Sequence, residues 1–195
     1  ICDYVTFISV YIGISLALSQ SIGNEIWYLS AFAGLCHAIQ SGAYELQRSE
    51  FDFWGKGKKS AALPNINEMI KAGEYKSSIG KISNQIHIGY IRMQYTFSGV
   101  DHTFRNSLKE VLSLAPEKEN EVRTLYRELY TPAVNSWSLL CANYRTLAIF
   151  TASIIGEPQY YFWFEVVILN LTLIFLVQKQ KLINNIFTLK LKEII

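Results

Sequence analysis

Positive charge is missing from long parts of this chain, and this distribution limits the possible folds more than any other feature. No Lys or Arg precedes Arg48, and between Arg127 and Lys179 the only one is Arg145. Two apolar blocks therefore flank a charged middle, in a chain of 195 residues of which 50% are hydrophobic. Because a helix crosses a bilayer with about 20 mainly apolar residues, the blocks predict membrane-spanning helices.

Four segments have this length or come close to it. They cover residues 4–20, 26–44, 134–155 and 160–177. The predicted fold class is therefore an all-α integral membrane protein with four transmembrane helices. Residues 1–195 are expected to form a single membrane domain, and residues 49–131 a cytoplasmic helical insertion between the second and third helices.

The charged middle contains a loop followed by helical patterns. The segment "FWGKGKKSAALPN" contains Gly, Pro and Asn and predicts a loop. After it, apolar residues such as Ile82, Ile86 and Ile91 recur every three to five positions, which favours a helix. Pro116 and the acidic residues behind it are typical of the start of a further helix.

Lysines and arginines favour the cytoplasmic side of a membrane when they lie close to a span. The turns "SQSIGNE" and "GEPQ" carry none, whereas the opposite ends of the spans are basic. We therefore expect Asp3, the middle segment and the C-terminus to face the cytoplasm. The other interface is expected to hold the aromatic side chains of Trp27, Tyr28, Tyr160, Tyr161 and Trp163.

Several functional classes find no support. The net charge of +2 and the absence of a basic run argue against a nucleic-acid partner. The three cysteines have no C-x-x-C spacing, and no phosphate-binding glycine loop or serine nucleophile motif is present. Because the sequence begins at Ile1 without a methionine or a signal peptide, we expect it to be part of a longer protein.

Polar residues form a stripe on the second apolar segment. His37, Gln40, Tyr44 and Arg48 are spaced by three, four and four positions, which places them on one helix face, and Glu45 lies next to Tyr44. Two interpretations stay open. The residues hydrogen-bond a neighbouring helix, as polar side chains do within membranes, or they form a site near the cytoplasmic end.

Two charged residues lie within the later apolar segments. Arg145 either extends its side chain to the membrane surface or faces an anionic phosphate, whose oxygens suit the guanidinium group. Glu165 lies early in the fourth segment, and we expect it to pair with another residue inside the helix bundle, because an unpaired charge in lipid is costly.

An aspartate at the head of an apolar span, followed by a span ending in "HAIQSGAYELQRSEFDFWGKG", resembles the CDP-alcohol phosphotransferase family. That family carries D-x-x-D-G-x-x-A-R, then eight residues, then G-x-x-x-D-x-x-x-D, whose last Asp is followed directly by apolar helix. Asp3 matches this last position, and the rest of the signature would lie before Ile1. The segment "NYRT" is also similar to bacterial branches of the family.

The resemblance implies a six-span enzyme of phospholipid biosynthesis in the bacterial inner membrane, with its active site facing the cytoplasm and a homodimer as its assembly. Such enzymes displace CMP from a CDP-linked lipid by the hydroxyl of an acceptor alcohol. Their four carboxylates bind two divalent cations, Mg²⁺ or Mn²⁺. Asp3 would be both a metal ligand and the general base. Residues on the acceptor side or near the lipid phosphate would be His37, Gln40, Tyr44, Glu45, Arg48 and Arg145.

Two other functions remain open at this point. A non-enzymatic membrane scaffold would tolerate alanine at Asp3 and along the polar stripe. A transporter fragment would use the intramembrane His, Arg and Glu as a path for a substrate or protons, and it would support uptake into vesicles without a divalent metal.

Overall fold

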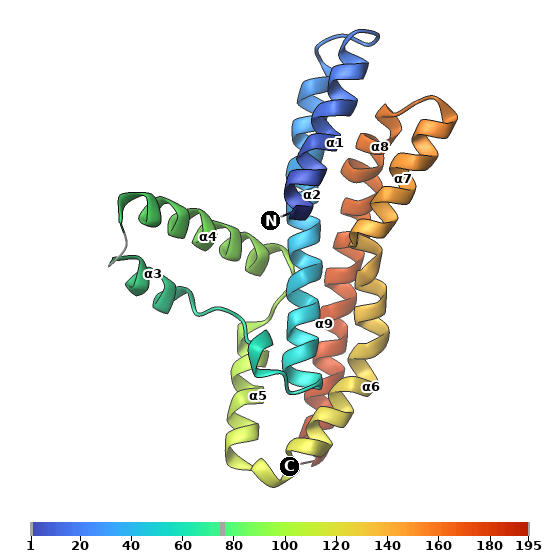
Figure 1. Cartoon of the computed structure of the whole chain (residues 1–195). Helices are drawn as coiled ribbons and strands as arrows, with labels where there is room; N and C mark the ends of the chain where they lie inside the picture. The colour runs from blue at the N-terminus through green and yellow to red at the C-terminus, as the bar shows by residue number, and fades with distance from the viewer. Residues whose placement is uncertain (1, 75–76, 195) are drawn as a thin grey trace. The chain divides into compact units, whose positions relative to one another are not determined.

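The computed structural model describes residues 2–74 and 77–194, without the side chains of residues 2–4, 74 and 194. The described part of the chain is all-helical and contains no strand. The prediction of an all-α fold is therefore confirmed. Figure 1 shows the order of the helices along the chain.

The longer helices are α1 (Cys2–Ser19), α2 (Ile26–Glu50), α3 (Ile66–Glu74), α4 (Ser78–Phe97), α5 (His102–Leu114), α6 (Glu119–Trp137), α7 (Ala142–Ile155), α8 (Gln159–Trp163) and α9 (Leu169–Ile194). Short 3₁₀ turns cover Lys59–Ala61, Pro116–Lys118 and Ser138–Leu140. Two π-helical turns follow α2 and α8, at Phe51–Gly55 and Phe164–Ile168.

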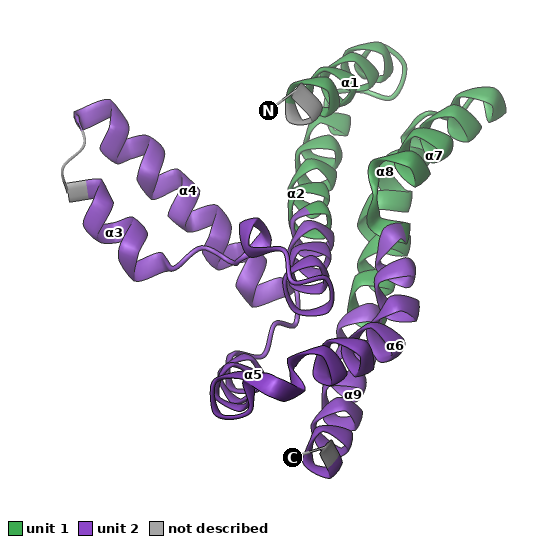
Figure 2. Cartoon of the chain, turned by 60° about the horizontal axis from the view of Figure 1, so that its bottom comes forward, with its two compact units in different colours: residues 1–41, 139–175 green, residues 42–138, 176–195 purple. Residues whose placement is uncertain are grey.

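The chain divides into two compact units, drawn in separate colours in Figure 2. Unit 1 contains residues 1–41 and 139–175, and unit 2 contains residues 42–138 and 176–195. Helices α2 and α9 each contribute residues to both units. The predicted insertion, residues 49–131, falls within the sequence range of unit 2.

Unit 1 is held together by apolar and aromatic packing. Its core includes Tyr11 of α1, Ala33 of α2, Ala152 of α7, and Tyr161 and Phe162 of α8. The small side chains of the two alanines let neighbouring helices approach closely. Helix α7 ends at Ile155 and is followed by Gly156, whose φ of +85° is the left-handed conformation that closes many helices.

Unit 2 has a separate aromatic core. The rings of Tyr126 and Tyr130 on α6 stack with centroids 3.9 Å apart, and Phe187 of α9 packs edge-on against both. Two arginines of α6 bind the π-helical turn: Arg123 Nη1 donates to the carbonyls of Phe53 and Trp54 at 2.9 and 2.7 Å, and Arg127 Nη1 to Gly55 at 2.8 Å. These bonds tie α6 to the π-helical turn that follows α2.

The structure confirms most of the helical pattern of the middle segment. Helix α4 covers the predicted apolar repeat, and Pro116 opens the turn that leads into α6. Asp101 caps α5 by accepting hydrogen bonds from Thr103 N and Phe104 N at 2.8 and 3.1 Å.

The predicted loop is partly wrong. Phe53, Trp54 and Gly55 belong to the π-helical turn, because the arginines of α6 bind its carbonyls, and Trp54 is buried in the core of unit 2. Helix α3 was not predicted as an element of its own, although Asn65 Oδ1 accepts a hydrogen bond from Asn67 N at its start.

Within the described residues, two helical stretches are long and apolar enough to cross a membrane, by length and composition. They are Pro116–Ile155 and Gln159–Glu193, which include the third and fourth predicted spans. In the described part of α1, the apolar stretch Val5–Ser19 is shorter.

Candidate functional site

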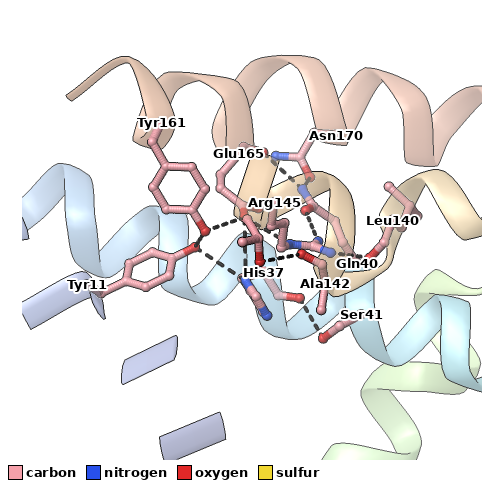
Figure 3. A network of polar contacts seen from close by, with 11 residues as sticks. Tyr11, His37, Gln40, Ser41, Leu140, Ala142, Arg145, Tyr161, Glu165 and Asn170 are labelled. Carbon is pink, nitrogen blue, oxygen red and sulfur yellow. Dashed lines mark hydrogen bonds and ion pairs between the residues drawn. The ribbon is translucent and has the colours of Figure 1, made fainter. Parts of the chain in front are cut away.

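A network of polar side chains lies inside unit 1, with a buried ion pair at its centre (Figure 3). Arg145 of α7 donates from Nε to Glu165 Oε1 at 2.9 Å, and neither side chain has any exposed surface. The same guanidinium donates from Nη1 to the carbonyl of Leu140 and from Nη2 to Gln40 Oε1 at 2.8 Å. Each nitrogen of the guanidinium group therefore has an acceptor within the unit.

Gln40 joins α2 to this ion pair and to the start of α9. Its Nε2 donates to the backbone carbonyl of Glu165 and to Asn170 Oδ1, both at 3.0 Å. Both hydrogens of the amide are thus used, and its oxygen accepts from Arg145. Asn170 is fixed in turn, because its Nδ2 donates to the carbonyl of Val166 at 2.8 Å.

Two tyrosines and a histidine complete the network. The hydroxyl of Tyr161 donates to Glu165 Oε1 at 2.8 Å and lies 3.1 Å from the hydroxyl of Tyr11. His37 Nδ1 lies 3.4 Å from both the Tyr11 hydroxyl and Glu165 Oε1. One carboxylate oxygen therefore meets a guanidinium, a phenol and an imidazole from three parts of the chain.

Local helix geometry brings these residues together. His37 and Gln40 are three positions apart on α2, so they share a face. Glu165 lies in the π-helical turn Phe164–Ile168, whose wider winding changes the direction of the side chains that follow. Tyr161 is four positions before Glu165 and therefore covers the same side.

The network matters energetically because its two charged side chains, Arg145 and Glu165, are buried away from solvent. Removing an ion from water costs several kcal/mol, of which a well-placed partner and additional hydrogen bonds return a large part. Glu165 Oε1 has three polar neighbours, and each nitrogen of Arg145 has an acceptor. The other carboxylate oxygen, Glu165 Oε2, is buried and accepts no hydrogen bond from the described residues. The bonds of Oε1 and of the guanidinium group hold the helices of unit 1 in one geometry.

His37 also lines an apolar groove between α1 and α2. The groove encloses about 370 Å³, and its walls are mainly apolar side chains such as Phe7 and Trp27. The imidazole packs against the ring of Phe7, with centroids 4.4 Å apart. In Figure 3 its Nε2 points away from Glu165. His37 and Tyr11, which lines the same groove, thus join the buried network to a cavity.

The other predicted site residues do not join this network. Tyr44 is half-buried, and Glu45 and Arg48 are exposed, all three in the part of α2 that belongs to unit 2. Glu45 Oε2 accepts a hydrogen bond of 3.4 Å from the hydroxyl of Tyr90 on α4. The backbone of Asp3 lies in the first turn of α1, but its side chain falls outside the described residues.

The structure decides between the interpretations of several polar residues. The interpretation that Arg145 reaches the membrane surface is wrong, because its guanidinium is buried and pairs with Glu165. The pairing of Glu165 inside the bundle is confirmed, and so is helix-to-helix hydrogen bonding by Gln40. Tyr161 was expected at a membrane interface, but it is 1% exposed because its hydroxyl binds Glu165.

Sequence reasoning missed Tyr11, Tyr161 and Asn170 as members of the network. The sequence signal was present, since each is a hydrogen-bonding residue within a strongly apolar segment. Such residues need a partner in a bundle, and only the three-dimensional arrangement shows which partner it is.

The metal centre that the resemblance implies would use Asp3, whose side chain falls outside the described residues, and carboxylates that would precede Ile1. Among the described residues, no three His, Cys, Asp or Glu residues lie together in a way that would hold a metal ion. Glu165 is paired with Arg145, which competes for its charge. Divalent Mg²⁺ requires octahedral coordination by oxygen, so the described side chains do not provide this site.

In comparisons with known proteins, no protein-family model, curated protein or solved structure matches this chain.

Proposed function

We propose that the chain is part of a membrane phosphotransferase that moves a phosphatidyl-type group from a CDP-linked alcohol to an acceptor alcohol and releases CMP. The observation that carries the proposal is the place of Asp3. Its backbone lies in the first turn of α1, and uncharged residues follow it to the end of that helix. A carboxylate on this turn would lie where a lipid and a water-soluble alcohol meet.

The proposal includes a membrane topology. The two long apolar stretches support it, and α1 and α2 would add two further spans. The basic residues on one side of these segments favour a cytoplasmic position for Asp3 and for residues 49–131. A bacterial inner membrane would then be the location, with a homodimer as the assembly.

The proposed reaction needs a base. The acceptor hydroxyl oxygen forms a bond to the phosphorus that carries the lipid, and the bond from that phosphorus to the bridging oxygen breaks. CMP leaves with the electron pair, and the hydroxyl proton passes to the carboxylate of Asp3. Reaction of a CDP-linked alcohol with a hydroxyl thus yields a phosphodiester, CMP and one proton.

The buried network would act as a positioning device in this enzyme. Tyr11 lies eight residues after Asp3 on α1, which is about 12 Å along a helix, and its hydroxyl is tied to Tyr161 and near His37. This arrangement fixes the helix that carries Asp3. Arg145 and Gln40 would serve by holding the bundle rather than by binding phosphate, because their polar atoms already have partners.

His37 is the best placed of the predicted substrate-binding residues, because it lines the apolar groove. Tyr44, Glu45 and Arg48 remain proposed contacts for the acceptor alcohol. Mg²⁺ or Mn²⁺ remains part of the proposal as the cofactor of the whole enzyme, although the described residues do not form its site.

The test is an acceptor screen. The protein as encoded by its complete gene is purified in detergent and mixed with CDP-diacylglycerol, Mg²⁺ and a panel of alcohols. The panel contains inositol, glycerol phosphate and serine. CMP released with one alcohol and not with the others supports the proposal and identifies the acceptor. Folded protein that releases no CMP with any alcohol contradicts it.

A scaffold without catalytic activity is the second candidate, and the buried ion pair favours it. Every nitrogen of the Arg145 guanidinium binds within the bundle, as a structural role requires. A scaffold predicts that Asp3→Ala leaves every measurable activity unchanged. A transporter, the third interpretation of the sequence, predicts solute uptake into vesicles in the absence of divalent metal.

A further inference from the structure

Helices α3 and α4 of unit 2 form a hairpin, visible in Figures 1 and 2 as two helices that run side by side. Asn84 of α4 donates from Nδ2 to the carbonyl of Met69 on α3 at 2.9 Å. The helices approach closely at Gly73, where an added Cβ would lie 2.4 Å from the same Nδ2. The hairpin is therefore a packed element with its own contacts.

One end of α4 is anchored to the rest of unit 2. Gln94 donates from Nε2 to the carbonyl of Gly42 on α2 at 3.2 Å, and the hydroxyl of Tyr95 donates to the carbonyl of Pro64 at 2.7 Å. Both residues lie in the last turn of α4. The first turns of the helix extend beyond these anchoring contacts.

These first turns expose a row of large apolar side chains. Ile79, Ile82 and Ile86 are 82%, 60% and 70% exposed, and their spacing of three and four positions places them on one face. Three large apolar side chains exposed to water on one helix face are unfavourable, since burying apolar surface is favourable. This row of side chains is suited to an apolar environment.

A groove with basic walls lies beside the isoleucines, between α3 and α4. It encloses about 510 Å³, and its lining includes Lys81, Gln85 and Arg92 of α4 together with Ile70 and Gly73 of α3. Lys81 and Arg92 are eleven positions apart on one side of the helix, about 16 Å along its axis. No acidic residue belongs to the described lining of the groove.

We propose that the α3–α4 hairpin binds the surface of an anionic membrane. Ile79, Ile82 and Ile86 enter the boundary between headgroups and acyl chains, while Lys81 and Arg92 contact lipid phosphates. An apolar face flanked by basic side chains is the pattern of helices that lie in a membrane interface. The arrangement does not depend on the proposed phosphotransferase activity.

A lipid surface fits the hairpin better than a soluble phosphate does. Free phosphate would use Lys81 and Arg92 but would leave the isoleucines in water. A membrane satisfies both features at once, because anionic headgroups attract the cations and the acyl region accepts the apolar side chains. Lys81 lies between Ile79 and Ile82 along α4, and Arg92 follows about 9 Å beyond Ile86 along the helix axis. The long side chains of Lys and Arg reach a headgroup layer from the sides of a helix whose apolar face is buried.

The test places a fluorescent reporter on the exposed row. Ile82→Trp is introduced into the full chain, and the protein is combined with vesicles whose acyl chains carry bromine, a quencher of tryptophan. Vesicles of phosphatidylcholine alone are compared with vesicles containing about 30% phosphatidylglycerol, which supplies the negative surface. The emission of the unsubstituted chain is subtracted to remove the fluorescence of its four native tryptophans. We expect quenching of the introduced indole that is strong only with the anionic lipid.

The charge variant Lys81→Gln with Arg92→Gln provides the second arm. Each basic residue near an anionic surface contributes about 1 kcal/mol, so the ratio of bound to free hairpin should fall about 30-fold. The matched control is Lys59→Gln with Lys109→Gln, which removes the same charge at exposed positions outside the hairpin and should leave the quenching unchanged.

Three results would overturn the proposal. The first is equal quenching in neutral and anionic vesicles, or none in either. The second is an equal loss of quenching in both charge variants, since net charge would then explain the effect. The third is loss of the contact on adding inorganic phosphate at constant ionic strength, which would assign the groove to a soluble phosphate ligand.

Discussion

Arg145 Nε lies 2.9 Å from Glu165 Oε1, and the two residues, 20 positions apart in the chain, form a fully buried ion pair. Gln40 Oε1 accepts from Arg145 Nη2, and the Tyr161 hydroxyl donates to the same Glu165 oxygen that pairs with Arg145. The pair thereby joins α2, α7 and the π-helical turn before α9. A charge inside an apolar unit is tolerated here because its partner and its hydrogen bonds are fixed in place.

Breaking this pair from either side should destabilise the protein strongly. Arg145→Met or Glu165→Met leaves one buried charge unpaired, which typically costs about 3–5 kcal/mol of unfolding free energy. The double variant should lose much less than the sum of the two. Urea unfolding in mixed micelles gives the loss of unfolding free energy for the two single variants and for the double variant.

The exposed pair of Lys58 and Asp52, with atoms 2.9 Å apart, is the control for this cycle, and its coupling should not exceed about 1 kcal/mol. Arg145→Met with unchanged stability would argue against a structural role and return Arg145 to the phosphate-binding interpretation.

Gln40 should be sensitive to an apolar replacement of similar size. Gln40→Leu leaves a donor of Arg145, the carbonyl of Glu165 and the amide oxygen of Asn170 without this partner. Each unsatisfied buried group costs about 1–3 kcal/mol. Gln178→Leu on the exposed side of α9 is the matched control, expected within about 0.5 kcal/mol of the parent. Equal effects at both positions would contradict the importance of the network.

The stability of unit 2 should depend on pH through Glu50. Burial raises the pKa of this carboxyl, although the charge of Arg105 and a hydrogen bond from Trp54 oppose the effect. The stability contribution of the neutral carboxyl is fully present below the unfolded pKa, about 4.3, and is lost as pH rises through the raised folded pKa. The parent should therefore lose stability relative to Glu50→Gln between acidic and neutral pH.

Asp52 provides a control of opposite sign. Hydrogen bonds from Lys56 and Lys58 lower its pKa, so its contribution is present above the ordinary value of about 3.9 and is lost as pH falls through the folded pKa. The parent should therefore gain stability relative to Asp52→Asn as pH rises from the acidic range to neutral, which is the opposite of the Glu50 effect. If the parent instead gains stability over Glu50→Gln as pH rises, the attraction of Arg105 outweighs burial and the sign is wrong.

Close packing of the α3–α4 hairpin gives a glycine test. Gly73→Ala places a methyl group against Asn84 Nδ2 and should displace the hydrogen bond to Met69, so amide exchange in α3 should accelerate. Gly89→Ala on the same hairpin meets no atom within 4 Å and should stabilise α4 by about 0.5–1 kcal/mol. Acceleration by both variants would show that the contact at Gly73 is not the cause.

The helical fold was predictable because its signals are local. Apolar segments, Pro116 at a helix start and the repeat around Ile82 each depend on neighbours in the sequence. The stripe containing His37 and Gln40 was found in the same way, from helical spacing. Pairing of Glu165 within the bundle followed from the cost of charge among apolar groups.

The partners in the network were not predictable, because contacts between distant segments create them. Gln40 and Arg145 are separated by 105 positions, and Tyr11 and Tyr161 by 150. The π-helical turn that holds Glu165 has no sequence signature comparable with a cap or a proline. The two-unit division within α2 also separates Tyr44 and Arg48 from His37, although all three lie on one helical stripe.

Release of CMP tests the central claim most directly. The protein encoded by the complete gene is compared with its Asp3→Asn variant, at equal amounts of folded protein, with CDP-diacylglycerol, Mg²⁺ and the acceptor found in the screen. The carboxylate removed is the proposed base, so release should fall by at least about 100-fold, whereas Asp52→Asn, a control outside the proposed site, should keep the parent rate. Asp3→Asn with the parent rate would contradict the phosphotransferase assignment.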